Sequence, residues 1–352
     1  MWTRSKGLRK IKPMSEVISQ LKIMSLNAEN LFLLSDQKLT SDHLKLDEIR
    51  WQKLSTSVFN NKPLEKAKAL GRIILSEDPD ILILSEVGGL ESLKNFSQLF
   101  LMDLYSPALL EGNSDRNIDV GFLVKKTSEF YFDVVSNKNR HINFLYPHER
   151  EDLEDPNSGK IPSHKFSRDV AELHLFTKDR EKPFLIFLAT HLKSRLDPNG
   201  YDPNGLMRRE AELRTLIEIY KELEAKHGEE LPIIVAGDFN GNASRFKTEA
   251  EFLPIYQSTQ LKDVTELAGF EEGASSTFYQ VGRNSKTEGK QLDYCFLNQR
   301  AQALLELSSV QIYRYRDHLG LEMDPPTTLD AKFHLPSDHY PLLFKLTSIP
   351  KS

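Results

Sequence analysis

The stretch LPIIVAGDFNGN (231–242) joins an apolar run to residues that could do chemistry. The run is typical of a strand buried on both faces, and Asp238 and Asn240 follow it after Gly237. Residues two apart at a strand end project to the same side. A carboxylate that is partly buried away from water needs a metal, a proton or a hydrogen-bond donor. The motif therefore indicates either a reactive carboxylate or, taken alone, an Asx-turn that closes the strand.

Polar residues also stand at the ends of other predicted strands: Asn27, Glu86, His191, Asp293 and the pair Asp338-His339. Each has a simpler explanation when it is taken alone. Asn27 could be a turn or cap residue, Glu86 a helix-entry acid and His191 a hydrogen-bonded core histidine. Asp293 could be a strand-edge acid, and the pair Asp338-His339 a turn. In layered α/β folds, strand ends on one side form a natural crevice. Carboxylates, amides and imidazoles without a thiol or a glycine-rich phosphate loop suit a hard cation and a phosphate ester.

The elements that must position these residues alternate along the chain. The pattern predicts helices over 46–58, 63–77, 90–101 and 206–228, and strands over 21–32, 80–89, 116–126, 129–135, 167–178, 183–194, 231–238, 277–282, 290–298, 308–316 and 337–346. Residues 136–163 are polar and rich in turn formers, which predicts a surface loop, and Asp179–Lys182 is the predicted turn of a hairpin. Residues 1–18 are predicted to be a flexible tail before one α/β domain over 19–350.

Composition narrows the class of protein. The 352 residues are 39% hydrophobic and 28% charged, as in a globular protein with a sizeable core. A net charge of −5 means that a nucleic-acid substrate would need a local basic surface or bound cations. Cys295 is the single cysteine, which excludes an internal disulfide. The basic N-terminus lacks a secretory apolar stretch, and no run approaches the ~20 residues that span a bilayer, so we expect a cytoplasmic protein without a membrane segment.

The ordered motifs SLNAENLF, PDILILSEV, DVGFLV, ATHLKS, GDFNGN, QLDYCFL and SDHYPL span residues 21–347. In this order they resemble the endonuclease/exonuclease/phosphatase superfamily, which includes deoxyribonuclease I, exonuclease III-like repair nucleases, neutral sphingomyelinases and inositol polyphosphate phosphatases. The resemblance implies a four-layer α/β sandwich of the DNase I type, in which two packed, mostly antiparallel sheets are flanked by helices. It also implies a monomer that acts on a phosphate ester.

The same resemblance implies a role for each residue at the strand ends. Asn27 and Glu86, with Asp338 as a further ligand, would hold Mg²⁺ or Mn²⁺. Asp238 would orient and deprotonate the attacking water, and Asn240 would hold that water or a phosphate oxygen. His339, supported by Asp293, would stabilise the phosphate or act as general acid, because a carboxylate favours the imidazolium. His191 would bind phosphate or protonate the leaving oxygen.

Three further residues are expected to bind substrate. Arg168 stands where many members of the superfamily place a phosphate-contacting arginine, and Lys193 and Ser194 follow His191 closely; the alternative for all three is an exposed surface position. The run Tyr313–Arg316 alternates aromatic and basic residues as a nucleic-acid groove does, although a strand with one solvated face also explains it. Asn117-Ile118 stand where some repair nucleases have a tyrosine, which counts against a dedicated abasic-site activity.

The leading hypothesis is therefore a Mg²⁺-dependent phosphodiesterase, a nuclease that acts on nucleic acid. The second is a phosphatase or phospholipase that acts on inositol phosphates or sphingomyelin. The third is a catalytically silent binding protein, and the filled acid, base and metal positions count against it. Specificity is expected to lie in the loops 137–163, 195–206 and 317–336.

Overall fold

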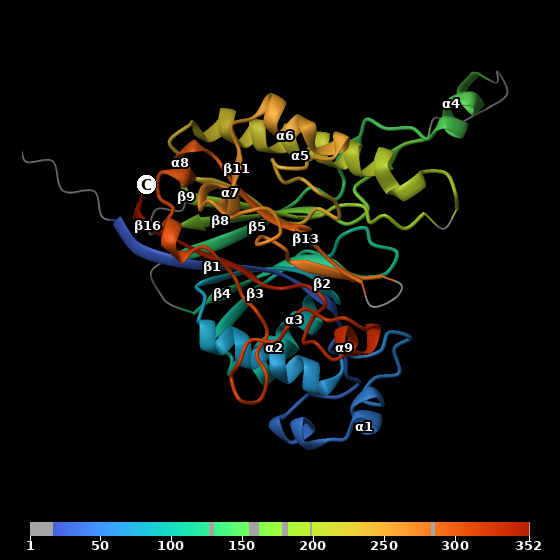
Figure 1. Cartoon of the computed structure of the whole chain (residues 1–352), viewed down its shortest axis with the longest axis vertical. Helices are drawn as coiled ribbons and strands as arrows, with labels where there is room; N and C mark the ends of the chain where they lie inside the picture. The colour runs from blue at the N-terminus through green and yellow to red at the C-terminus, as the bar shows by residue number, and fades with distance from the viewer. Residues whose placement is uncertain are drawn as a thin grey trace, which may run out of the picture.

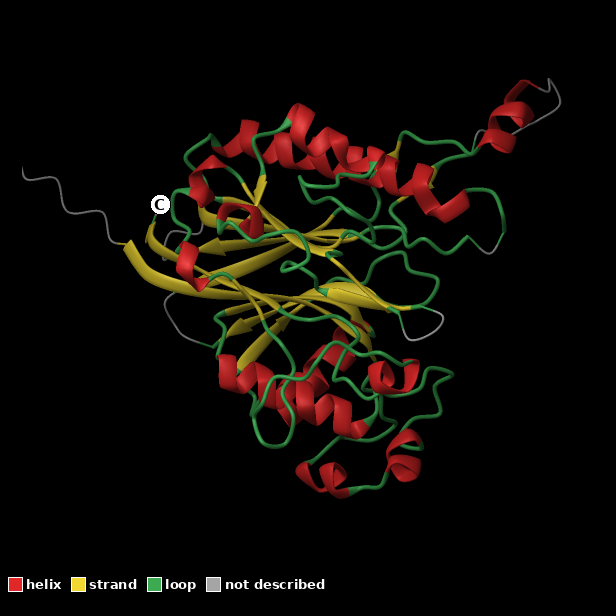
Figure 2. Ribbon diagram, in the orientation of Figure 1, coloured by secondary structure: helices red, strands yellow, loops and turns green. Residues whose placement is uncertain are grey.

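Two six-stranded sheets lie face to face, and helices cover the outer face of each (Figures 1 and 2). The computed structural model describes residues 17–126, 130–154, 162–177, 182–197, 199–282 and 286–351, with the side chains of 152–154 left out. The four layers confirm the predicted DNase I-like sandwich of two mostly antiparallel sheets. Each sheet contains one parallel pair of strands at its centre.

The first sheet has the strand order β15-β16-β1-β2-β4-β3. Its parallel pair is β1 and β2, and the other neighbours run antiparallel. The strands are β1 (Val17–Leu31), β2 (Ile81–Val87), β3 (Tyr105–Ala108), β4 (Asp119–Lys125), β15 (Gln311–Ile312) and β16 (Leu342–Pro350).

The second sheet has the strand order β11-β14-β10-β9-β8-β5. Its parallel pair is β9 and β10, so that the last residues of these two strands, His191 and Asp238, are register partners. The strands are β5 (Tyr131–Ser136), β8 (Val170–Phe176), β9 (Pro183–His191), β10 (Ile233–Asp238), β11 (Lys262–Asp263) and β14 (Asp293–Leu297). Two small two-stranded sheets lie outside the six-stranded sheets: β6 (His141–Ile142) pairs with β7 (His164–Lys165), and β12 (Phe278–Val281) with β13 (Thr287–Lys290).

The central strands are buried on both faces, and the unbroken apolar run of β10 predicts this for that strand. On β1, Ile23 packs in the core between the sheets, whereas the next residue, Met24, packs in the core under the helices. On β10, Ile234 and Val235 divide in the same way. Neighbouring side chains thus enter two different cores, which is the two-residue period of a strand.

Helices cover these sheets through their apolar faces. The first sheet is covered by α2 (Leu64–Glu77) and α3 (Gly89–Phe100), and the second by α5 (Leu206–His227) and α6 (Leu253–Ser258), as Figure 1 shows. The remaining helical segments are short: α1 (Glu48–Gln52), α4 (Pro147–Glu154), α7 (Val264–Leu267), α8 (Gln299–Gln302), α9 (Leu329–Phe333) and the 3-10 turns 41–45, 203–205, 250–252 and 307–309. Among the described helices, none is long and apolar enough to cross a membrane.

Several predicted boundaries are wrong. The helix predicted over 46–58 is limited to α1, and the strand predicted over 308–316 shrinks to the two residues of β15. The predicted surface loop 136–163 contains β6 and α4. Strand β1 begins at Val17 and therefore includes the last two residues of the predicted tail. Residues 1–16 of that tail, and 179–181 of the predicted hairpin turn, lie outside the described residues.

Candidate active site

Asp238 lies at the point where the two sheets meet. It is the last residue of β10, is 1% exposed, and accepts a hydrogen bond from Asn27 of β1, Nδ2 to Oδ2, at 2.9 Å. Its other oxygen accepts the backbone N–H of Asn240 at 2.8 Å. Burial raises the pKa of Asp238 to about 7, with the Asp293 carboxylate also raising it and the charge of His339 opposing them. This carboxylate is therefore poised to gain or lose a proton near neutral pH.

The backbone at Gly237 leaves no room for a side chain against β9. Its φ is +132°, and a Cβ at this position would lie 1.9 Å from the carbonyl oxygen of Thr190. Only glycine fits such a conformation and such a contact. The glycine of the GDFN motif thus sets the approach of the two strands whose ends carry His191 and Asp238.

His339 and Asp293 form a buried pair. Nδ1 of His339 lies 2.7 Å from Oδ2 of Asp293, and the opposite ring nitrogen, Nε2, lies 3.9 Å from Oδ2 of Asp238. Burial by itself lowers the pKa of His339, but Asp293, Asp338 and Asp238 outweigh it and raise the pKa to about 10. His339 is therefore an imidazolium at neutral pH, and its Nε2–H points toward the carboxylate of Asp238.

His191 has the opposite character. Its Nε2 lies 3.7 Å from Oδ2 of Asp238, and Nδ1 is buried without a hydrogen-bond partner among the described residues. Burial, together with the charges of Arg168 and His339, lowers the pKa of His191 well below its usual value. The site thus contains one charged and one neutral imidazole, each within 4 Å of the same carboxylate.

Glu86 and Arg168 border this cluster. Glu86 adopts a φ of +60°, and its Oε2 accepts the backbone N–H of Asn30 at 3.0 Å. Arg168 is 6% exposed, and its Nε is buried without a hydrogen-bond partner among the described residues. Burial lowers the pKa of Arg168, while the negative charges of Glu212, Glu86 and Asp238 act against that shift. Arg168 therefore belongs to the electrostatic environment of the carboxylates.

Asp338 has a partner that its motif does not reveal. Its Oδ2 lies 3.4 Å from Nζ of Lys332, which also donates to the carbonyl of Tyr279 and lies 3.4 Å from the centre of the Phe278 ring. Burial alone would raise the pKa of Asp338, but His339 and Lys332 lower it. The carboxylate is thus ionised and already partly neutralised, so its role as a metal ligand stays a prediction.

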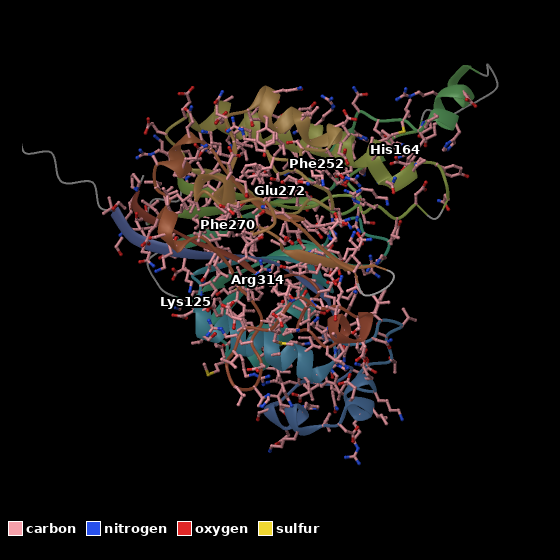
Figure 3. The ribbon with its side chains drawn as sticks, viewed as in Figure 1. Lys125, His164, Phe252, Phe270, Glu272 and Arg314 are labelled. Carbon is pink, nitrogen blue, oxygen red and sulfur yellow. The ribbon has the colours of Figure 1, made fainter. Side chains whose placement is uncertain are left out.

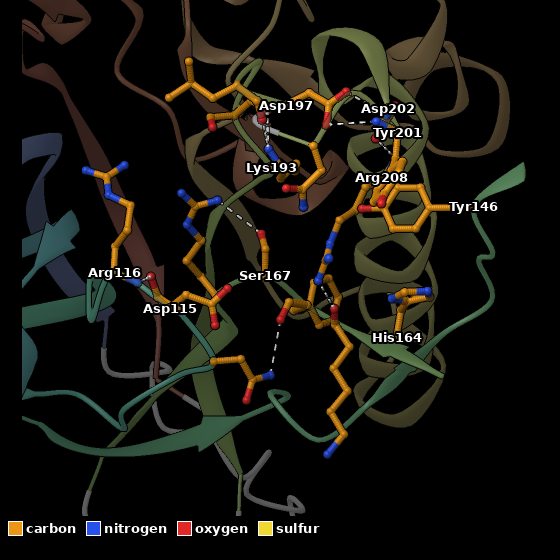
Figure 4. Close-up of a pocket in the computed structure, with 18 of the residues that line it drawn as sticks. Asp115, Arg116, Tyr146, His164, Ser167, Lys193, Asp197, Tyr201, Asp202 and Arg208 are labelled. Atoms are coloured by element: carbon orange, nitrogen blue, oxygen red, sulfur yellow. Dashed lines mark hydrogen bonds between the residues drawn. The ribbon is translucent and has the colours of Figure 1, made fainter. Parts of the chain in front are cut away.

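Lys193, Ser194 and Arg168 line a neighbouring pocket of about 770 Å³, shown in Figure 4. The amine of Lys193 donates to the carbonyl of Ser194 at 3.0 Å and to that of Leu196. Asn240 lies at the edge of the cluster, where its Nδ2 donates to the carbonyl of Leu192 at 3.0 Å. The three residues predicted to bind substrate are therefore together, beside the predicted catalytic residues.

The donor set fits a divalent cation. Asp238, Asp293 and His339 offer ligand atoms that lie within 4.8 Å of one another, and Oδ1 of Asp293 is buried without a hydrogen-bond partner among the described residues. Carboxylate oxygens in a small number suit a hard cation that keeps several waters. Because Nδ1 of His339 is already bonded to Asp293, we assign this pair to proton control. With Asp238 assigned to the attacking water, Glu86 and the amide oxygen of Asn27 remain for a cation.

Three supporting residues were missed by sequence reasoning. Ser337 donates to the backbone carbonyl of Asn27 at 2.7 Å and accepts the N–H of His339, while Thr277 accepts the N–H of Asp293. The buried Tyr315 donates to the backbone carbonyl of His339 at 2.5 Å. Ser337 stands in the SDH motif, where it could have been noticed. Tyr315 belongs to the run Tyr313–Arg316, whose alternation predicts a groove or a strand face and not this hydrogen bond, and Thr277 has no sequence signal.

The run Tyr313–Arg316 is not a free nucleic-acid groove. Tyr315 is buried, and Arg314, labelled in Figure 3, lies over the rings of Tyr279 and Tyr340 at 5.6 and 5.2 Å. Its guanidinium also donates to the backbone carbonyls of Ser276 and Ala274. This segment supports the loop that carries His339.

Two mixed sheets with helices outside, and a polar cluster shared by both sheets at their strand ends, define the DNase I-like fold of the endonuclease/exonuclease/phosphatase proteins. The sequence itself matches no protein-family model and none of the curated proteins. The likeness is carried by solved structures at low sequence identity.

Three solved structures illustrate this likeness. An endonuclease/exonuclease/phosphatase family protein from Bacteroides thetaiotaomicron is 18% identical with a TM-score of 0.55, and the match covers 95% of this chain and 96% of that one. TDP2 from D. rerio, complexed with a single-strand DNA product, is 18% identical with a TM-score of 0.54 over 93% and 99% of the two chains. The human Nocturnin catalytic domain with bound sulfate is 17% identical with a TM-score of 0.53 over 95% and 97%. The resemblance seen in the motifs thus extends to the fold.

Proposed function

We propose that this chain hydrolyses phosphodiester bonds in nucleic acid with the help of a divalent cation, Mg²⁺. The observation that carries the proposal is the environment of Asp238. It is a buried carboxylate with a pKa of about 7, fixed by Asn27 from the opposite sheet and placed within 4 Å of one charged and one neutral imidazole. A general base with such a pKa is suited to remove a proton from water.

The cation would be held by Glu86 and Asn27, with Asp338 as a further ligand. When bound, Mg²⁺ supplies Lewis-acid stabilisation of the phosphate oxygens and of the charge that develops in the transition state. Asn27 also keeps Asp238 in place through its Nδ2, since the opposite amide atom, Oδ1, accepts the N–H of Glu29 at 2.9 Å. This amide therefore has a defined orientation.

Asp238 would orient the attacking water and take its proton, and Asn240 would hold that water or a phosphate oxygen. His339 remains protonated because Asp293 stabilises its imidazolium, so it would donate through Nε2 to the negatively charged phosphate. His191 stays neutral, which favours a hydrogen bond to phosphate over delivery of a proton to the leaving oxygen. Arg168 adds a fixed positive charge beside these groups.

Nucleic acid is proposed over other phosphate esters on two grounds. The neighbouring pocket contains arginine, lysine and aromatic residues, a combination suited to phosphates and bases. One protein of the same fold, TDP2 from D. rerio, is complexed with a single-strand DNA product.

The test is Mg²⁺-dependent hydrolysis of plasmid DNA, RNA, sphingomyelin and inositol phosphates by the wild-type protein, by Asp238→Ala and by His339→Ala. We expect hydrolysis of a nucleic acid, loss of activity in EDTA, and a fall of at least about 100-fold in both variants. Asp42→Ala, which removes an exposed carboxylate, is the matched control and should behave as wild type. Equal and negligible rates for wild type and both variants on all four substrates would refute the proposal.

A further inference from the structure

The pocket beside the candidate active site has two chemically different ends. Figure 4 shows Arg116 on one side and Tyr146 and Tyr201 on the other, and the predicted phosphate-binding Arg168 also lines the pocket. Its volume of about 770 Å³ is within the usual range of ligand sites, about 300–1,000 Å³. Since Arg168 also borders Asp238, the cationic end adjoins the proposed catalytic residues.

The aromatic end is a stack of three rings that we call the aromatic cluster (Tyr146, His148 and Tyr201). The rings of Tyr146 and His148 are nearly parallel, with an angle of 11° and centres 5.7 Å apart, and the Tyr201 ring lies 4.4 Å from that of His148. Tyr201 is 53% exposed. The outermost ring of the cluster therefore has surface available for another ring.

Further side chains pack against the Tyr146 ring of the aromatic cluster. The Tyr146 ring packs edge-on against Phe144 at 4.6 Å and His164 at 5.3 Å. Glu149 lies 2.8 Å from Nε2 of His164 and accepts the backbone N–H of Tyr146 at 2.7 Å. The ring of Tyr146 at the base of the cluster is therefore fixed before a ligand arrives.

The cationic end is suited to an anion. Nε of Arg168 is buried without a hydrogen-bond partner among the described residues, and Arg168 contributes to lowering the pKa of Lys193, second to burial. A phosphate placed between these two cations would reduce their repulsion.

The acids that line the pocket are mostly engaged with the protein itself. Asp202 accepts the backbone N–H groups of Met207 and Arg208, Asp197 accepts those of Tyr201 and Asp202, and Glu149 pairs with His164; Asp115 lies beside Arg116 in Figure 4. These acids are thus engaged in contacts with loops and helices, and Arg168 and Lys193 supply the positive charge of the cationic end.

We propose that this pocket binds the nucleotide next to the scissile phosphate in a single-stranded nucleic acid, with its phosphate at Arg168 and Lys193 and its base stacked on Tyr201 of the aromatic cluster. The inference rests on the proposed function and adds the form of the substrate. A base inside a duplex has both faces covered by its neighbours, whereas an unpaired base can offer a face to an aromatic side chain. Stacking of this kind does not depend on the identity of the base.

The test compares two single strands of equal length, an oligothymidylate and a strand of tetrahydrofuran abasic residues that has the same phosphates and no bases. The wild-type protein should show a kcat/KM about tenfold higher for the oligothymidylate. Tyr201→Ala should abolish this preference, and Tyr201→Phe, which keeps the ring, should retain it. Lys193→Gln should lower kcat/KM for both strands to the same extent, because both have the phosphates.

Tyr131→Ala is the matched control. Tyr131 is exposed to a similar degree, 49%, but lies opposite Phe176, at the end of β8 far from Arg168. This variant should keep the wild-type preference. The proposal is overturned if Tyr201→Ala retains the preference, if wild type cleaves both strands equally, or if a blunt duplex is cleaved faster than the single strand.

A binding measurement distinguishes failure of this inference from failure of the proposed function. If the wild-type protein hydrolyses neither strand, the four-substrate assay above decides the proposed function, and the affinity for a fluorescein-labelled oligothymidylate, measured by anisotropy, decides the inference. Tyr201→Ala should raise Kd about tenfold for oligothymidylate and leave Kd for the abasic strand within about twofold. No binding by wild type, or equal shifts for both strands, would overturn it.

Discussion

Replacing Gly237 by alanine should disable the site and destabilise the fold together. The added Cβ would lie 1.9 Å from the carbonyl oxygen of Thr190, while real contacts of this kind begin near 3.0 Å. The nearest atoms all belong to the backbone of β9, so no side chain can rotate away. β10 must therefore move from β9 by about 1 Å, and Asp238 is the next residue along the moving strand.

The size of the effect follows from the two costs at this position. A residue other than glycine at this φ costs about 1–3 kcal/mol, and opening the ladder at Gly237 and Thr190 costs about 1 kcal/mol for each hydrogen bond lost. We expect a loss of about 3–5 kcal/mol in the free energy of unfolding. A displacement of about 1 Å at a catalytic group can reduce the rate about 100-fold.

Urea unfolding and the phosphodiesterase assay measure the two effects on the same samples. Gly269→Ala is the matched control, because Gly269 also has a positive φ, +74°, but a Cβ there meets no atom within 4 Å. Gly269→Ala should lower the free energy of unfolding by about 1 kcal/mol and leave activity intact. If Gly237→Ala is as stable and as active as Gly269→Ala, then close packing of β9 on β10 does not position Asp238.

Three other changes test different parts of the structure. Asp293→Asn should reduce kcat about 100-fold with the fold retained, because His339 loses the charge that keeps it protonated. Arg209→Met should lower the free energy of unfolding by about 3–5 kcal/mol, since it leaves Glu251 buried without its partner at 2.6 Å. Burial raises the pKa of Asp169 from 3.8 to about 6, so its contribution to stability is present below pH 4 and is lost as the pH rises through 6. The free energy of unfolding of Asp169→Asn, relative to that of wild type, should therefore increase by about 2–3 kcal/mol as the pH rises from 4 to 7.

Each of these predictions has a clear contrary result. A kcat within threefold of wild type for Asp293→Asn, with circular dichroism unchanged, would show that the carboxylate does not support His339. A loss below about 1 kcal/mol for Arg209→Met in urea unfolding would mean that Glu251 finds another partner; Arg214→Met, at an exposed ion pair, is the control. A constant difference in stability between Asp169→Asn and wild type across the pH range would contradict the raised pKa.

The long regular elements could be predicted from sequence because their patterns are strong. The apolar run before Asp238 has no polar interruption, and α5 ends at Gly228 as its stop signal predicts. Prediction failed where tertiary contacts decide the backbone. Tyr315 alternates with basic residues like a strand residue, yet it is buried and bonded to the carbonyl of His339 in irregular structure.

The residues of the candidate site could also be predicted, whereas the hydrogen bonds and ion pairs between them could not. Ordered motifs at strand ends identified Asn27, Asp238 and His339, since strand ends of a layered fold converge. No pattern reveals that Asn27 bonds to Asp238 across the two sheets, or that Lys332 pairs with Asp338, because these partners are distant in sequence or come from short helices. The fold thus follows from local periodicity, and the charge states follow from the assembled structure.

The strand order has a further consequence for how this site holds together. The central parallel pair of each sheet is flanked by antiparallel strands, so β1, β2 and β16 occupy the places that β10, β9 and β14 occupy in the other sheet. Two hydrogen bonds of the site that cross between the sheets, Asn27 to Asp238 and His339 to Asp293, each join such an equivalent pair, with His339 just before β16. The site thus consists of two pseudo-symmetric halves. If the chain has the proposed activity, its rate should fall under any stress that lets one sheet slide over the other, before either sheet unfolds.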